Sequence, residues 1–362
     1  MTHIKRVVLL MIIINIVFLS GCSSFFVENN TVEEIAPVIF WSIQEGESGK
    51  LKISTLVPPL INEKKSMLTL QVNLLKQGRK DFNLVYYREL KSGQLRMLFI
   101  SEELAKKGIL PLIDTLLTDP DISQRLYLVV IKGNFDDYIR NQVDKQENLD
   151  YFLYRMLKHY ETKNQGDITV INLHQFLKRL YSPFSDPILP VFKVNKENFI
   201  YNGTAFFKDD KLVATISDMN DQILQLLNND YYLKLLPIPS LAVSLGQIRS
   251  KVIIKLAPDY SSISIKVNLV GRIEEYRGDK NIVDSDELED LNQEIKSYLE
   301  KQTTALLQKM QQWKVDPLQV GTHSLTPFSQ PIKDEEWLRK WGNMELQINY
   351  QLDLQTMTNV NK

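Results

Sequence analysis

The sequence predicts an α+β fold of several domains, in which mainly antiparallel or mixed sheets pack against helices. Two segments, Leu51 to Val57 and Ile263 to Ile273, alternate apolar and polar residues, as strands with one buried face do. A third, Asp284 to Trp313, repeats apolar residues at spacings of three and four, which indicates a long helix. The C-terminal half therefore reads as an antiparallel sheet covered by one long helix.

Residues 1–21 have the features of a secretory signal peptide. Lys5 and Arg6 precede a 13-residue run, Val7 to Leu19, that is apolar except for Asn15. This run is shorter than the roughly 20 residues that cross a bilayer. Leu-Ser-Gly-Cys follows and resembles the lipobox of bacterial lipoproteins, whose cysteine receives diacylglycerol before the peptide is cleaved. The resemblance implies lipidation at Cys22, and we expect residues 22–31 to form a tether; an ordinary signal peptide with an incidental cysteine is the alternative.

Composition limits the remaining possibilities. Cleavage of this leader would leave about 340 residues, enough for two or three domains. The 43 basic and 44 acidic residues are spread along the chain and give a net charge of −1. Nucleic-acid binding needs a concentrated basic surface, so nucleic acid is not expected as a partner. The single cysteine excludes an internal disulfide and any site with several cysteine ligands.

Residues 32–190 are expected to form an N-terminal α+β region, and the sequence leaves open whether it is one domain or two. Ser101 is suited to cap a helix that ends before Gly108. Phe152, Met156, Leu157 and Tyr160 share helical spacing. The predicted strands are 51–57, 68–74, 96–100 and 126–131; the predicted helices are 102–107, 111–117 and most of 135–181; 82–86 could be either.

Three prolines between Ser182 and Pro190 indicate a domain boundary or a crossing segment, and residues 197–362 are expected to form a C-terminal α+β domain. Asp284 and Glu287 match a capping box at the start of the long helix. The expected elements are hairpins at 199–216 and 251–273, helices at 218–227 and 284–313, and a strand at 344–354.

No motif in the sequence predicts catalysis or metal binding. The chain has four histidines, His3, His159, His174 and His323, and none has a carboxylate or cysteine at ligand spacing. Glycine-rich phosphate loops and nucleophile elbows are absent. Two pairs of acids, Asp119 with Asp121 and Asp209 with Asp210, are better explained as turn residues. Trp337 and Trp341 share a helix face and are expected in the core, with a binding platform as the alternative. We therefore predict no catalytic, metal or cofactor residues and no enzyme activity.

Several segments, taken in order along the chain, carry a family likeness: the lipobox, Leu98 to Ile109, Asp114 to Asp121, Asn202 to Val213, Gly271 to Glu275, Gln308 to Asp316, and the pair Trp337 and Trp341. This ordered set resembles the C-subunit lipoproteins of spore germinant receptors, found in endospore-forming Firmicutes. Two positions depart from the family pattern: Ser23-Ser24 stand where many members have Trp-Asp, and Gln94 stands where members often have histidine.

The resemblance implies an elongated α+β protein of three domains without enzyme activity. It implies assembly with a membrane A subunit and a polytopic B subunit at the spore inner membrane, with Cys22 holding the body on the extracytoplasmic face. The expected function is that of a non-enzymatic subunit of a nutrient germinant receptor. A substrate-binding lipoprotein of a transporter is the main alternative, and a secreted hydrolase the second.

Overall fold

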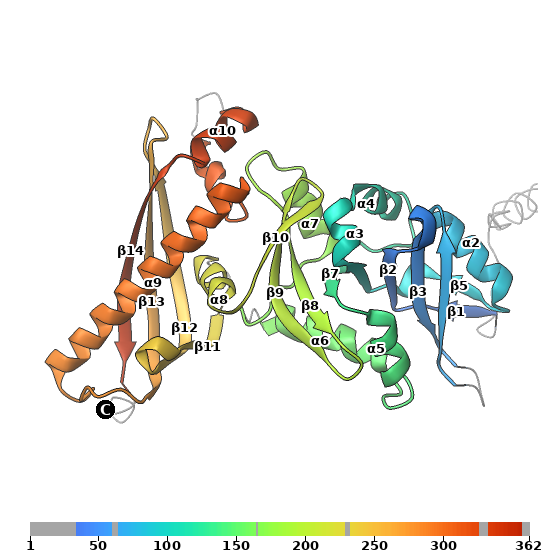
Figure 1. Cartoon of the computed structure of the whole chain (residues 1–362), viewed down its shortest axis with the longest axis horizontal. Coiled ribbons are helices and arrows are strands. Elements are labelled where there is room, and N and C mark those ends of the chain that lie inside the picture. Colours follow the sequence, from blue (N-terminus) through green and yellow to red (C-terminus); the bar gives the residue numbers. More distant parts are fainter. Residues whose placement is uncertain (1–33, 60–63, 164–165, 229–231, 326–331, 357–362) are drawn as a thin grey trace, which may run out of the picture.

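The computed structural model describes residues 34–59, 64–163, 166–228, 232–325 and 332–356. The body is elongated, and two sheets follow one another along its long axis (Figure 1). We call the eight-stranded sheet the large sheet and the four-stranded sheet the small sheet. A two-stranded parallel pair, β1 (Ile35–Pro37) with β5 (Glu89–Lys91), lies at the end of the large sheet away from the small one.

The large sheet has the strand order β10-β9-β8-β7-β6-β2-β3-β4. Its four central strands, β8, β7, β6 and β2, are parallel, and antiparallel strands flank them on both sides. The strands are β2 (Phe40–Glu45), β3 (Leu51–Val57), β4 (Ser66–Val72), β6 (Met97–Ser101), β7 (Tyr127–Lys132), β8 (Ile188–Val194), β9 (Phe199–Lys208) and β10 (Lys211–Ile216).

Helices cover both faces of the large sheet, so its central strands are apolar on both sides. On β6, Leu98 packs toward the core that holds Ile113 of α4, and Phe99 packs toward the core that holds Phe135 of α5. The helices around this sheet are α2 (Leu75–Val85), α3 (Glu102–Lys107), α4 (Leu110–Leu117), α5 (Phe135–Gln142), α6 (Leu149–Lys163) and α7 (Leu173–Leu180).

The predicted order of strand, helix, helix, strand between residues 96 and 131 is confirmed by β6, α3, α4 and β7. The Ser101 side chain accepts a hydrogen bond from the Leu104 backbone N–H, and Gly108 ends α3 with a positive φ of 118°. The predicted apolar face of α6 is wrong at Phe152, which is half-exposed. Leu149, Leu153 and Leu157, spaced four apart, are the residues that α6 buries in the core.

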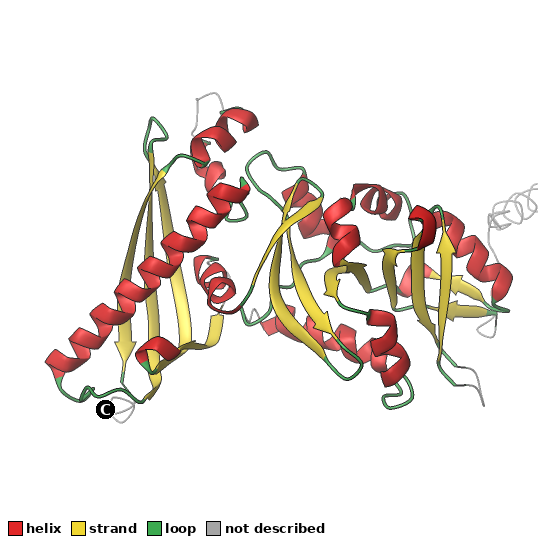
Figure 2. Cartoon of the chain, in the orientation of Figure 1, coloured by secondary structure: helices red, strands yellow, loops and turns green. Residues whose placement is uncertain are grey.

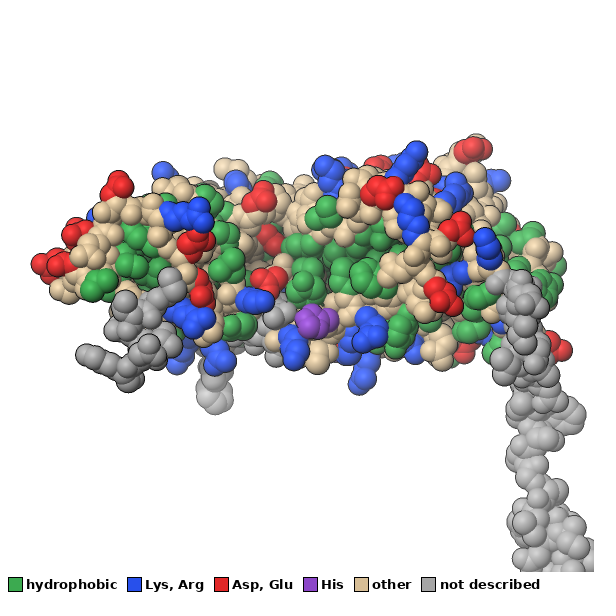
Figure 3. Space-filling model, turned by 90° about the horizontal axis from the view of Figure 1, so that it is seen from below, with side chains coloured by type: hydrophobic (Ala, Val, Ile, Leu, Met, Phe, Trp, Pro, Cys, Tyr) green, Lys and Arg blue, Asp and Glu red, His purple; other side chains and the backbone are tan. Residues whose placement is uncertain are grey.

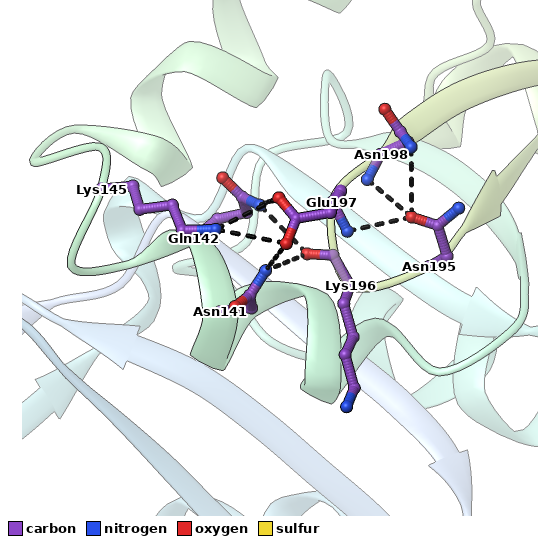
Figure 4. A network of polar contacts seen from close by, with 7 residues as sticks. All are labelled: Asn141, Gln142, Lys145, Asn195, Lys196, Glu197 and Asn198. Carbon is purple, nitrogen blue, oxygen red and sulfur yellow. Dashed lines mark hydrogen bonds and ion pairs between the residues drawn. The ribbon is translucent and has the colours of Figure 1, made fainter.

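The hairpin of β9 and β10 forms as the sequence predicts, but it does not join the small sheet. β9 pairs antiparallel with β8, so the large sheet continues past the proline-rich segment 182–190. The turn between β8 and β9 is short, which favours antiparallel pairing of neighbouring strands. In this turn Asn195 Oδ1 accepts hydrogen bonds of 2.9 Å from the backbone N–H groups of Glu197 and Asn198 (Figure 4). Lys145, just after α5, pairs with Glu197 across 3.1 Å.

The small sheet has the order β11-β12-β13-β14, with helix α9 across one face (Figure 2). The pairings β11–β12 and β12–β13 are antiparallel, but β13 and β14 run parallel. The prediction of an antiparallel sheet is therefore wrong for this last pair. The strands are β11 (Tyr232–Ile238), β12 (Val243–Leu256), β13 (Ser262–Tyr276) and β14 (Glu345–Gln355). The remaining helices are α8 (Asp218–Leu227), α9 (Ser285–Trp313), α10 (Asp334–Trp341) and four short 3₁₀ turns, Glu47–Gly49, Ser92–Gln94, Pro239–Leu241 and Val320–Ser324.

Helix α9 connects the two parallel strands and buries one side against them. The Asp284 side chain caps α9 by accepting from the N–H groups of Asp286 and Glu287. The capping box is wrong in one half, because the Glu287 side chain accepts from Asn281 N–H and not from Asp284 N–H. Near the middle of α9, Thr303 Oγ1 lies 2.8 Å from the hydroxyl of the buried Tyr350 on β14.

Candidate functional site at the junction of the two sheets

The three described histidines that the sequence analysis considered as catalytic or metal-binding residues lie on different elements of the structure. His159 and His174 are exposed on separate helices, and His323 lies in the turn Val320–Ser324. Within the described ranges, no group of three or more His, Cys, Asp or Glu side chains is placed to hold a metal ion. Nor does any helix of those ranges have the length and apolar character needed to cross a bilayer. Cys22 lies outside the described residues.

The acid pairs take part in turns. Asp119 Oδ1 accepts from the backbone N–H of Asp121 over 3.1 Å. Asp210, at the tip of the β9–β10 hairpin, has a role that sequence reasoning missed: its Oδ2 accepts from the N–H of Leu110 at the start of α4. Trp337 and Trp341 are both buried and stack with ring centroids 6.1 Å apart, which agrees with the predicted core role.

Two clusters of buried polar groups lie where the two sheets meet. We call this region the junction; it comprises the segment 182–187, helix α8, and the loop 314–325 that follows α9. Asp186 of the first segment and Asp316 of the loop exchange two hydrogen bonds. Asp316 N–H donates to Asp186 Oδ2 over 2.6 Å, and Asp186 N–H donates to the carbonyl oxygen of Asp316 over 3.1 Å.

Both carboxyl groups of this pair have further partners. Asp186 Oδ1 lies 3.0 Å from Nζ of Lys208 at the end of β9. Asp316 accepts from the N–H groups of Val320 and Gly321 at 2.9 and 2.8 Å, which fixes the turn after α9. Burial raises the pKa of Asp316 to about 7 and also raises the pKa of Asp186.

A second buried cluster connects the large sheet to α8. Asp221 of α8 accepts from the Thr204 hydroxyl at 2.6 Å and from the Tyr201 hydroxyl at 2.8 Å, both on β9. Thr169 lies 2.6 Å from Thr204 and accepts from Gln225 of α8 at 2.8 Å. Burial raises the pKa of Asp221 to about 6 and raises the pKa of Tyr201. Every hydroxyl in this cluster therefore has a polar partner inside the protein.

A cavity of about 250 Å³ lies at the junction and is bordered by both sheets. The large-sheet side contributes Ile188 and Arg179, whose guanidinium donates to the carbonyl oxygen of Pro317 over 2.6 Å. The other side contributes Val252 of β12 and His323, whose pKa burial lowers. The side chains bordering the cavity include no nucleophile paired with a base. The hydrogen bonds around this cavity connect the large sheet with the loop after α9 and with α8.

Sequence reasoning missed the junction because its residues are far apart along the chain. Asp186 and Asp316 are separated by 130 positions, and no spacing rule brings them together. One local signal was present. Both acids stand directly before a proline, a position at which the sequence does not distinguish an exposed turn acid from a buried one.

Comparison with known proteins identifies the family. A model described as the spore germination protein N-terminal domain matches residues 28–194, and one described as spore germination B3/GerAC like, C-terminal, matches residues 202–357. The chain is 22% identical over 268 residues to the spore germination protein GerQC of Bacillus cereus, covering 72% of this chain and 71% of GerQC. The crystal structure of the GerBC protein has a similar fold, with a TM-score of 0.51, 15% identity, and coverage of 88% of this chain and 96% of GerBC. The chain therefore belongs to the GerAC family of spore germination proteins, the C subunits of germinant receptors.

Proposed function

We propose that the protein is a lipid-anchored, non-enzymatic subunit of a nutrient germinant receptor. In this proposal Cys22 carries the lipid, and the folded body stands on the outer face of the spore inner membrane. It assembles there with a membrane A subunit and a polytopic B subunit. Family membership supports the germination role, and the lipobox supports the anchor.

The observation that carries the proposed mechanism is the hydrogen-bonded junction. Asp186 and Asp316 link the large sheet to the loop after α9, and Asp221 links the same sheet to α8. In this proposal, a displacement that a partner imposes on one sheet is transmitted to the other sheet through these buried, directional contacts. We propose that this body couples ligand binding in other subunits to the release of ions and dipicolinate.

Deletion of the gene tests the proposal, with germination of purified spores scored against single nutrients. We expect loss of the response to one nutrient class, with normal sporulation and normal responses to the others. Restoration by the wild-type gene is the control. Unchanged germination with a defect in vegetative solute uptake would overturn the proposal in favour of a transport lipoprotein. If paralogous receptors mask the phenotype, co-purification with the A and B subunits decides the question.

A further inference from the structure

Helix α2 ends in a group of exposed apolar side chains at one end of the molecule. Leu84, Val85 and Tyr87 are 74%, 64% and 65% exposed, and we call these three residues the α2 tip. Hydrophobic side chains gather at the end of the body that α2 and β5 form (Figure 3). Single exposed apolar residues are common, but three large ones within four positions mark a contact surface.

The α2 tip is held by buried neighbours. Phe82 on the preceding turn is buried, and its carbonyl oxygen accepts from Tyr86 N–H over 2.9 Å. Arg88, which follows the tip, is also buried and donates to the carbonyl oxygens of Pro58, over 2.9 Å, and of Ile35. The tip therefore exposes its side chains from a fixed backbone.

The same contacts bring the tip to the place where the fold begins. Glu89 N–H, two residues after Tyr87, donates to the carbonyl oxygen of Glu34 over 2.8 Å. Glu34 follows Cys22 by twelve positions, and a chain of that length spans at most about 40 Å. A lipid on Cys22 would hold this end of the body, more than any other, close to the bilayer.

We infer that the α2 tip contacts the membrane, so that the bilayer surface covers Leu84, Val85 and Tyr87. The inference rests on the proposed lipid at Cys22. Tyrosine rings and aliphatic side chains suit the boundary between headgroups and acyl chains. With two attachments at one end, the long axis projects away from the bilayer and the small sheet lies farthest from it.

The chain's single cysteine makes a direct test possible. With Cys22 lipidated, a cysteine introduced by Leu84→Cys is the only free thiol and can carry an environment-sensitive fluorophore. Val283→Cys is the matched control, because Val283 is 73% exposed and precedes α9 at the opposite end of the molecule. Both lipidated proteins are placed in phosphatidylcholine vesicles, with and without nitroxide-labelled acyl chains. We expect about twofold quenching of the label at position 84 and none at position 283.

Two results would overturn the inference while leaving the anchor intact. In the first, the protein floats with the vesicles but positions 84 and 283 are equally unquenched. In the second, a label placed by Phe152→Cys on α6 is quenched and position 84 is not, which would mean that the body lies on its side. A lipidated preparation that fails to float with vesicles would contradict the anchoring proposal itself, and the inference with it.

Discussion

Asp186 and Asp316 hold the junction together by two reciprocal hydrogen bonds between residues 130 positions apart. The shorter one runs from Asp316 N–H to Asp186 Oδ2 at 2.6 Å, and the other returns from Asp186 N–H to the Asp316 carbonyl oxygen. Both side chains are almost fully buried. Removing a buried carboxyl group leaves its hydrogen-bond donors without an acceptor in the interior, so it costs more stability than removing an exposed one.

We expect Asp316→Ala to lower the free energy of unfolding by about 3 kcal/mol, because the N–H groups of Val320 and Gly321 lose their acceptor in the interior. Urea unfolding followed by tryptophan fluorescence measures the change. Asp353→Ala, on the exposed side of β14, is the control and should stay within about 0.5 kcal/mol of the wild type. Equal stability of the two variants would contradict a stabilising role for Asp316.

Stability should depend on pH through Asp221. Burial raises its pKa to about 6, above the value of about 4 in an unfolded chain. The folded state then binds more protons than the unfolded state, so the free energy of unfolding falls as pH rises from about 4 to about 6. Asp221→Asn keeps an acceptor for the Tyr201 or Thr204 hydroxyl and removes the ionisation. Between pH 4.5 and 7.5, we expect the free energy of unfolding of the variant to fall by about 2 kcal/mol less than that of the wild type.

This difference is read from urea midpoints at several pH values. Asp353→Asn serves as the matched control, because Asp353 is exposed, and its pH profile should follow that of the wild type. Parallel profiles for the wild type and Asp221→Asn would contradict the prediction, because they would show that the pKa of Asp221 is the same in the folded and unfolded states.

Gly203 on β9 should tolerate no side chain. Its φ of 121° is unfavourable for other residues, and a Cβ atom there would lie 1.9 Å from the carbonyl oxygen of Ile216. We expect Gly203→Ala to destabilise the protein by about 3 kcal/mol or more, or to prevent soluble expression. Gly93→Ala is the control, because nothing lies within 4 Å of a Cβ at that position. Thermal unfolding of both variants makes the comparison, and equal melting temperatures would contradict it.

Replacement of Cys22, the proposed lipidation site, should release the protein from membranes. Cys22→Ala removes the thiol to which diacylglycerol would be attached. The short apolar run of the leader does not replace an anchor of two acyl chains. Detergent phase partition and immunoblotting of spore fractions should place the variant in the aqueous phase. Ser23→Ala should remain with the membrane, and membrane retention of Cys22→Ala would indicate a different anchor.

Local sequence patterns predicted most of the helices and strands, but not which strands pair with one another in the sheets. Alternation in β13 and β14 identified two strands and their buried faces, because side chains alternate with a period of two. The same alternation gives no information about the relative direction of two strands, so the parallel pairing of β13 with β14 was missed. Likewise, the hairpin β9–β10 was evident from its charged turn, but its pairing with β8 depends on the short turn at Asn195.

The junction could not be predicted for a different reason. Thr204 and Asp221 become buried only when α8 packs between the sheets, and in sequence they resemble residues of an ordinary strand and an ordinary helix start. Burial of a polar residue is a property of the tertiary fold. For the α2 tip, the unresolved choice between helix and strand at 82–86 concealed which side chains would face solvent.

The parallel pairing of β13 and β14 has a consequence for biogenesis. β14 is hydrogen-bonded to β13 from Ser262 to Arg272, and all of α9 and α10 must be synthesised before β14 is available. Until then β13 presents an open edge to other chains, which invites aggregation and proteolysis. A nonsense mutation ahead of Glu345 would leave that edge exposed permanently, so we expect such products to be degraded during sporulation and not to form partly active receptors.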